Sequence, residues 1–190
     1  MLFLLAWLLN YDITVSTVNS VTVIALQLLG LPIQYLYVNL VVYFIFDIVS
    51  KRVKRRSDMS HHLLSLLTIF YILLCHPDIV DTVATAATAV EISTIPLNFY
   101  HDSKRSKERP KAETPVITDL ISTRSWQYLF LTCFIVFRFP VYIWLLNPVI
   151  TTLDLTVFYY SWLSLNSYWL VWMVKKFVIS EMVNKSKKQE

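Results

Sequence analysis

The chain has 190 residues, of which 56% are hydrophobic and only 16% charged, with a formal net charge of +4, a balance that predicts a membrane protein rather than a soluble globular domain. The single glycine, Gly30, excludes glycine-rich phosphate loops, dinucleotide-binding fingerprints and nucleophile elbows, because each of these needs several glycines. The cysteines Cys75 and Cys133 lie inside apolar runs and form neither a disulfide framework nor a CxxC site, and we predict no metal site and no bound cofactor.

Six apolar segments follow one another along the chain, at residues 13–31, 35–49, 60–75, 79–99, 126–146 and 153–179. Several approach the ~20 residues that a helix needs to cross a bilayer. Backbone groups must be satisfied internally in lipid, and the segments lack the alternation of membrane β-barrel strands, so we predict helices. The predicted fold class is therefore all-α: a polytopic membrane protein whose six transmembrane helices form one domain over residues 13–179.

The connections between these segments alternate in charge. Every Lys and Arg except Arg138 falls in residues 50–58, in residues 100–125 or at and beyond the end of the last segment. By the positive-inside rule, both long loops and both termini lie in the cytosol. Basic loops at an anionic leaflet also account for the net charge, so we do not predict nucleic-acid binding. Residues 100–125, which contain Pro110 and Pro115, are expected to form a flexible, exposed loop.

The two ends of the chain carry different signals. Residues 1–12 are apolar but too short to span a bilayer, and they lack the basic start of a signal peptide. Residues 180–190 form a basic tail, in which Lys187-Lys188 resembles the dilysine signal that coat proteins recognise when they return membrane proteins to the endoplasmic reticulum. The alternative is a solvated basic tail. The sequon at Asn184 is expected to stay unmodified, because this topology places it in the cytosol.

Polar side chains recur at helical spacing on the first three segments. Ser16, Ser20 and Gln27 share a face of the first, with Asn19 adjacent, and the second segment places four polar residues on one face, namely Asn39, Tyr43, Asp47 and Ser50. The third begins with His61-His62, and His61, Ser65 and Thr68 share a face. Because Asp47 and the histidines lie across a short loop, we predict a carboxylate–imidazole pair suited to a general base or nucleophile. An interfacial location of the two histidines is the alternative.

The fourth segment is the most polar. Its stripe of small and polar residues comprises Ala84, Ala87, Glu91, Thr94 and Asn98, and residues 82–89 are almost all small, which lets neighbouring helices approach closely. Arg138 on the fifth segment is the expected partner of Glu91, either at a functional site or as a structural ion pair. Pro96 and Pro140 are expected to bend their helices.

The sixth segment completes the set of polar faces, with Tyr159, Trp162, Asn166 and Trp169 on one side. Pooled, the six faces would line an internal, partly hydrated cavity. The alternative is that they act only as hydrogen-bonding contacts between helices.

These residues, in this order, resemble the TLC family, the membrane domain shared by ceramide synthases, the translocating-chain-associated membrane protein and many TLC-domain-containing proteins. The resemblance covers about residues 11–176. It is carried by six motifs in order, one on each helix: Ser16-Thr17-Val18-Asn19-Ser20, Tyr43-Phe44-Ile45-Phe46-Asp47, His61-His62, Glu91-Ile92-Ser93-Thr94-Ile95-Pro96-Leu97-Asn98, Phe134-Ile135-Val136-Phe137-Arg138 and Leu165-Asn166-Ser167-Tyr168-Trp169. Asn19 stands where the family has His, and the longer His-Asp-x-Ser-Asp signature of ceramide synthases is absent, which places the chain nearer the TLC-domain-containing proteins.

The resemblance implies a six-helix, barrel-like bundle around a lipid-accessible cavity, and the dilysine-like tail predicts a location in the endoplasmic reticulum. It implies a catalytic group of His61, His62, Asp47 and Glu91, with acyl-CoA as co-substrate. The residues expected to bind substrate are Asn19, Tyr43, Thr94, Asn98, Arg138, Asn166 and Trp169.

Three functions remain open from the sequence. The first is a protein that binds an acyl chain or lipid and influences membrane lipid composition or trafficking. The second is an acyltransferase acting on a lipid amine, and the third is a helper of membrane-protein insertion. The expected partner is a membrane lipid, and a dimer is an open alternative to a monomer.

Overall fold

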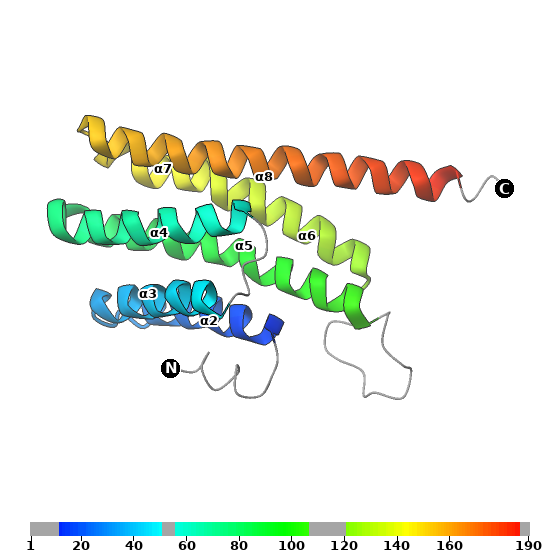
Figure 1. Ribbon diagram of the computed structural model, residues 1–190, viewed down its shortest axis with the longest axis horizontal. Helices are drawn as coiled ribbons and strands as arrows, with labels where there is room; N and C mark the ends of the chain where they lie inside the picture. Colours follow the sequence, from blue (N-terminus) through cyan, green and yellow to red (C-terminus); the bar gives the residue numbers. More distant parts are fainter. Residues whose placement is uncertain (1–11, 51–55, 107–120, 187–190) are drawn as a thin grey trace. The chain divides into compact units, whose positions relative to one another are not determined.

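The computed structural model describes residues 12–50, 56–106 and 121–186, and within these ranges the chain is all-α (Figure 1). The helices are α2 (Asp12–Leu28), α3 (Ile33–Val49), α4 (Arg56–Cys75), α5 (Val80–Ser106), α6 (Thr123–Val136), α7 (Tyr142–Leu146) and α8 (Leu153–Ser186). Short turns lie between them at η1 (Pro77–Ile79), η3 (Phe137–Val141) and η4 (Asn147–Val149). Because α6, η3 and α7 follow without a break, each of the six predicted segments is confirmed as helical. The apolar residues 1–12 lie almost entirely outside the described ranges, and Lys187-Lys188 lies wholly outside them.

The turn between α2 and α3 depends on the single glycine. Gly30 has a φ of 61°, in the left-handed region that favours glycine. Its N–H donates to the carbonyl of Gln27 at 3.2 Å, and the N–H of Leu31 donates to the carbonyl of Leu26 at 3.2 Å. These two bonds form a Schellman motif, which satisfies carbonyls that the end of the helix would otherwise leave open. Gly30 therefore ends α2 and lets the chain turn toward α3.

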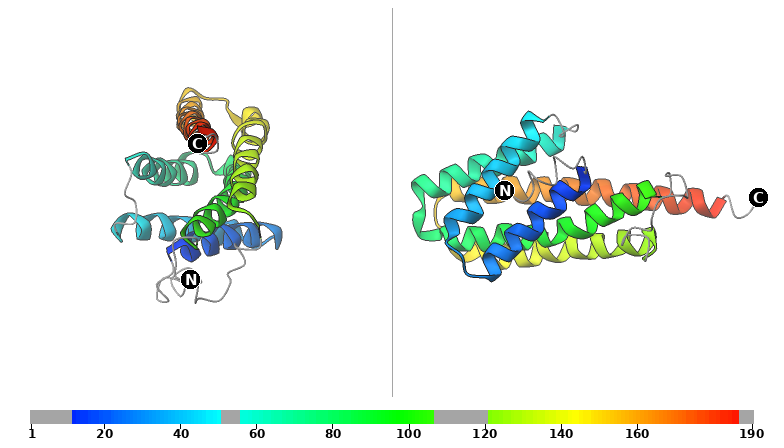
Figure 2. Two further views of the ribbon diagram at one scale, coloured as in Figure 1. Left: turned by 90° about the vertical axis from the view of Figure 1, so that its right-hand side faces the viewer. Right: turned by 90° about the horizontal axis from the view of Figure 1, so that it is seen from below.

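The chain divides into two compact units, Met1–Ile150 and Thr151–Glu190. In the first unit α5 packs against α2 and against α6, while α3 packs against α2 and α4 (Figure 2). Ala84 and Ala86 of α5 are almost fully buried, which fits the close approach expected from the small residues of this helix. The second unit holds α8, a single helix of 34 residues that continues past the predicted end at residue 179. Within the first unit, α5 therefore lies between α2 and α6 as their common neighbour.

The fifth apolar segment changes its helical geometry at Pro140. The segment is α-helical to Val136, forms a π-helical turn over Phe137–Val141 and becomes α-helical again from Tyr142. Proline lacks an N–H and its ring clashes with the carbonyl one turn earlier, so a widened turn relieves the conflict. Pro96, by contrast, lies within α5 without ending it. The irregularity at Pro140 includes Arg138.

The long polar loop is shorter than predicted. Helix α5 continues through Ser106, and α6 begins at Thr123, so both ends of the region predicted as loop at residues 100–125 are helical. Residues 100–106 contain no proline or glycine, and the Ser103 hydroxyl lies 2.7 Å from that of Thr123, which ties the two helix ends together. The prediction of a loop at residues 100–106 and 123–125 is therefore wrong, and residues 107–120 lie outside the described ranges.

Two helical stretches are long and apolar enough to cross a membrane, Asp58–Cys75 and Thr123–Val149. Ser16–Leu28 and Ile33–Val49 are apolar but shorter. Among the described residues, length and composition thus mark two of the six predicted spans.

Candidate functional site

The polar stripe of α2 lies against the polar stripe of α5. Moving along α2, Ser16 accepts a hydrogen bond from Asn98 at 3.1 Å, and Ser20 donates to Oε2 of Glu91 at 2.5 Å. Farther along, the side-chain amide of Gln27 donates to the hydroxyl of Thr85 at 3.2 Å. In these three pairs the residue numbers rise along α2 and fall along α5. The two helices therefore run antiparallel, with their polar faces opposite each other. The face predicted on the first segment therefore has its complement on the fourth.

Asn19 faces a different helix from its neighbour Ser20. Its Oδ1 accepts a hydrogen bond from Nδ2 of Asn39 on α3 at 2.8 Å. Asn19 is 1% exposed, and among the described residues no group accepts a hydrogen bond from its Nδ2. The predicted substrate-binding residue Asn19 is thus a buried amide with a donor left over.

Charged and hydroxyl side chains gather where α2 and the fifth segment meet α5. We call Ser20, Glu91, Ser93, Thr94 and Arg138 the arginine cluster. Nε of Arg138 donates to the Ser93 hydroxyl at 2.9 Å, and a second guanidinium nitrogen lies 3.5 Å from the Thr94 hydroxyl. Ser93 in turn donates to the carbonyl of Val90 at 2.7 Å, which turns an oxygen lone pair toward the guanidinium.

Glu91 and Arg138 also attract each other as charges. They are 8% and 6% exposed, so opposite charges on the two groups lie where water screens them little. The guanidinium also lies over the ring of Phe134, 4.9 Å from its centroid. The expected partnership of Glu91 and Arg138 therefore includes two serine hydroxyls, one on each charged group.

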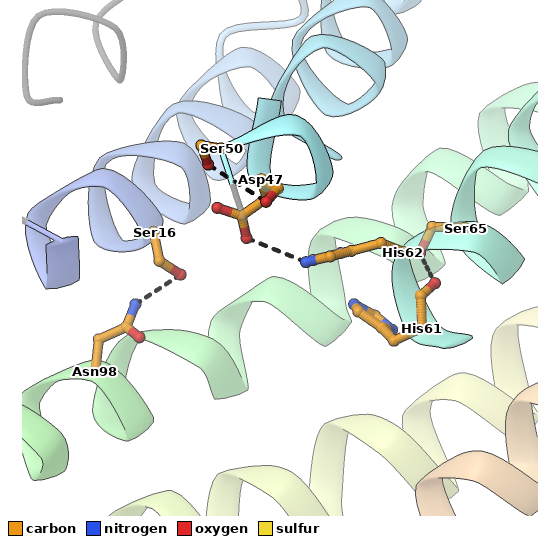
Figure 3. Close-up of polar contacts among 7 residues, drawn as sticks. All are labelled: Ser16, Asp47, Ser50, His61, His62, Ser65 and Asn98. Carbon is orange, nitrogen blue, oxygen red and sulfur yellow. Dashed lines mark hydrogen bonds and ion pairs between the residues drawn. The ribbon is translucent and has the colours of Figure 1, made fainter. Parts of the chain in front are cut away.

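A second group of polar residues lies between α3 and α4, and we call Asp47, His61 and His62 the histidine cluster (Figure 3). Nε2 of His62 lies 3.1 Å from Oδ2 of Asp47. A neutral imidazole donates to a carboxylate through the protonated nitrogen, so this contact fixes the tautomer and leaves Nδ1 with a lone pair. Among the described residues, Nδ1 of His62 has no hydrogen-bond partner although it is buried.

Aromatic rings hold His62 in place. The ring of Tyr43 meets it edge-on at 6.1 Å between centroids, and the ring of Phe44 lies 5.1 Å away. The His61 ring lies 5.3 Å from that of His62 and edge-on to Phe44 at 5.9 Å. The contact with Asp47 distinguishes His62 from His61, a distinction that the sequence could not make.

The buried face of α4 differs from the predicted one. The predicted polar face comprises His61, Ser65 and Thr68, whereas the buried residues are His62, Ser65, Ile69 and Ile72. The hydroxyls of Ser65 and Thr68 donate to carbonyls of their own helix, at His61 and Leu64. Both hydroxyl protons are therefore used within α4, and of the three residues predicted to share a face, Ser65 is the one that is buried.

The remaining predicted site residues fall into two groups. Tyr43, Thr94 and Asn98 lie in the first unit with the contacts described above, whereas Asn166 and Trp169 lie on α8 in the second unit. Sequence reasoning left Ser93 out of the site, although its side chain is fully buried and holds Arg138. A buried arginine needs several hydrogen-bond acceptors, and Ser93 lies two residues from Glu91, its expected partner. That proximity could have indicated Ser93 from the sequence.

Among the described residues, no group of three or more His, Cys, Asp and Glu side chains could hold a metal ion. What the site offers is a proton acceptor at His62, a hydrogen-bond donor at Asn19 and a paired charge at Glu91 and Arg138. In comparisons with known proteins, no family profile, no curated protein and no solved structure matches the chain.

Proposed function

We propose that this chain is an integral membrane protein of the endoplasmic reticulum, with its termini and its basic loops on the cytosolic side. The observation that supports membrane insertion is the distribution of side chains around the first-unit helices. An apolar stripe lies exposed on α3 at Tyr35, Val38, Val42, Ile45 and Val49, and another lies exposed on α4 at Leu63, Leu67, Phe70 and Leu74. The same helices bury Asn39 and His62. They also bury apolar residues, among them Leu36, Phe44 and Ile72, so both helices are apolar on the exposed side as well as on the buried side, which suits lipid.

We further propose that the protein binds an acyl chain or amphipathic lipid between its helices and thereby influences membrane lipid composition or trafficking. The observation that carries this proposal is the buried His62, with Asp47 on one ring nitrogen and a lone pair on the other. A buried polar atom without a partner costs free energy, about 1–3 kcal/mol. Its retention in an apolar setting is typical of groups that meet a ligand.

The Asp47–His62 contact also favours a second function, acyl transfer. In that reaction Nδ1 of His62 takes a proton from a lipid amine as the amine nitrogen attacks the thioester carbonyl of acyl-CoA. The carbon–sulfur bond then breaks, the coenzyme A thiolate leaves, and the imidazolium returns the proton to it. Asp47 supports the imidazolium through Nε2. The products are an amide-linked lipid and coenzyme A.

Lipid analysis of cells that express the protein tests both functions. We expect the purified protein to retain lipid in native mass spectrometry, and cells expressing His62→Ala to lose the lipid change that the unmodified protein produces. His76→Ala is the matched control, because His76 lies at the far end of α4, where it contacts Tyr71. If the His62→Ala protein retains lipid and its cells have the same lipid profile as cells with the unmodified protein, lipid binding is supported and acyl transfer through His62 is excluded.

The orientation can be tested with a native residue. Cys75 is exposed at the end of α4 opposite the basic loop, and Cys133 can be replaced by serine. We expect a membrane-impermeant maleimide to modify Cys75 only after sealed microsomes are permeabilised. Modification in sealed microsomes would reverse the proposed orientation.

A further inference from the structure

Asn19 offers a buried hydrogen-bond donor between α2 and α3. Asn39 occupies its Oδ1, and among the described residues nothing accepts from its Nδ2. The hydroxyl of the adjacent Ser20 donates to Glu91 and to the carbonyl of Ser16, and it does not serve as the acceptor for Asn19 in the described part of the chain. A ligand that pairs with Nδ2 of Asn19 must therefore supply a hydrogen-bond acceptor.

Buried apolar residues lie close to Asn19 and to its partner Asn39 along both helices. Val23 lies one turn along the same helix and is fully buried, and Leu36 and Leu40 flank Asn39 on α3 with almost no exposed surface. A charged acceptor such as a phosphate would have to leave water to reach this point, which is costly. A neutral oxygen on an otherwise apolar molecule fits better.

The depth of Asn19 in the membrane further limits which ligands could reach it. With a rise of about 1.5 Å per residue, Asn19 lies about 10 Å from the start of α2 at Asp12 and about 14 Å from its end at Leu28. In a hydrocarbon layer about 30 Å thick, this is well below the head groups. A lipid that places an oxygen there must do so without carrying a charged head group into the hydrocarbon.

We propose that Nδ2 of Asn19 binds the acyl carbonyl oxygen of a neutral lipid that enters between α2, α3 and α5. A carbonyl oxygen accepts and does not donate, so it matches the unpaired donor. The acyl chain beyond it lies along apolar side chains of the same helices. This inference rests on the proposed lipid binding and adds to it the chemical class of the ligand and the residue that recognises it.

The test uses two probes that differ only at the carbonyl. The protein is reconstituted in phosphatidylcholine nanodiscs that contain either dioleoylglycerol, which has ester carbonyls, or the dialkyl ether of glycerol with the same chains. Retained probe is counted by mass spectrometry after the protein is extracted in mild detergent. We expect about tenfold more of the ester than of the ether, the ratio expected for one buried hydrogen bond.

Variants assign the preference to Asn19. Asn19→Leu should reduce the ester-to-ether ratio to about one, and Asn19→Ala should do the same, because both variants remove the amide donor. Thr22→Val is the control, because the Thr22 hydroxyl donates only to the carbonyl of Val18 among the bonds described for it. Infrared spectra of carbonyl-labelled dioleoylglycerol bound to the unmodified protein should show the carbonyl stretching band at lower wavenumber than in empty nanodiscs. This measurement does not depend on the folding of a variant.

The outcomes separate this inference from the function on which it rests. Equal retention of both probes would overturn the inference and leave lipid binding in place, with a water on Asn19. A preference that persists in both Asn19 variants would also overturn it. Retention of neither probe would overturn the proposed binding of neutral lipid together with the inference.

Discussion

The arginine cluster and the histidine cluster are both buried and polar, yet they use their hydrogen-bonding capacity differently. Glu91 accepts from Ser20, Arg138 donates to Ser93, and Ser93 donates onward to a backbone carbonyl. In the histidine cluster, Asp47 engages one nitrogen of His62 and leaves the other without a partner among the described residues. In the arginine cluster the side chains pair with one another and with the backbone, whereas in the histidine cluster Nδ1 of His62 can still accept a hydrogen bond.

This difference assigns structure to one cluster and chemistry to the other. A network whose members satisfy one another stiffens the helices that carry it, and it becomes costly to break. A partly engaged histidine contributes little to stability and is available to a ligand. Changes in the arginine cluster should therefore mainly lower the free energy of unfolding, and changes in the histidine cluster should mainly alter lipid handling.

The largest loss of stability is expected for Arg138→Met. Removing the guanidinium leaves Glu91 buried without its opposing charge, a change that costs about 3–5 kcal/mol in other proteins. We expect a loss of that size in denaturant titrations in detergent micelles, or a failure to fold. The double variant Arg138→Met with Glu91→Gln removes both charges and should recover most of the loss. A cost below about 1 kcal/mol for the single variant would contradict a structural role.

A smaller loss is expected for Ser93→Ala. The hydroxyl accepts from a charged donor, and hydrogen bonds to charged groups contribute about 1.5–3 kcal/mol. The same unfolding titration measures the effect. Ser161→Ala is the matched control, since the Ser161 hydroxyl is exposed and donates to its own helix at Val157. If the two alanine variants are equally stable, Ser93 does not hold Arg138.

The two clusters also differ in how far the sequence could predict them. The stripe of Ser16, Ser20 and Gln27 predicted a polar face on α2, and helical periodicity was sufficient because that helix is regular. The bond between Arg138 and Ser93 was not predictable in this way. A π-helical turn surrounds Arg138, and each residue that a widened turn adds rotates the chain by about 100° relative to a regular helix.

The choice between the two histidines was beyond the pattern for another reason. Adjacent residues on a helix point about 100° apart, and either His61 or His62 could have begun the polar face of α4. In the structure His62 packs against Tyr43 and Phe44 of α3 and lies on the buried face of α4. The helices were predictable from composition, since apolar runs bounded by Gly30 and the basic loops leave few alternatives.

The turn at Gly30 connects the two clusters, because α2 contributes to the arginine cluster and α3 to the histidine cluster. Gly30→Ala should cost about 1–2 kcal/mol, the price of a left-handed residue with a Cβ. Nothing lies within 4 Å of an added Cβ, so the cost is one of backbone conformation alone. Gly30→Asn should cost less, because asparagine tolerates this conformation. Equal costs for the two variants in unfolding titrations would mean that crowding, not backbone conformation, determines the residue.

The smallest loss of stability is expected for Asp47→Asn, at about 1 kcal/mol or less, because the Asp47 side chain is 15% exposed and makes one bond to His62. Yet this change should affect lipid handling as strongly as His62→Ala, since an amide can donate to Nε2 and so favour the tautomer that carries its proton on Nδ1. The unfolding titration and the lipid analysis of the same variant together test the comparison. A stable Asp47→Asn protein with unchanged lipid handling would remove the histidine cluster from the function, and a strongly destabilised one would make it structural like the arginine cluster.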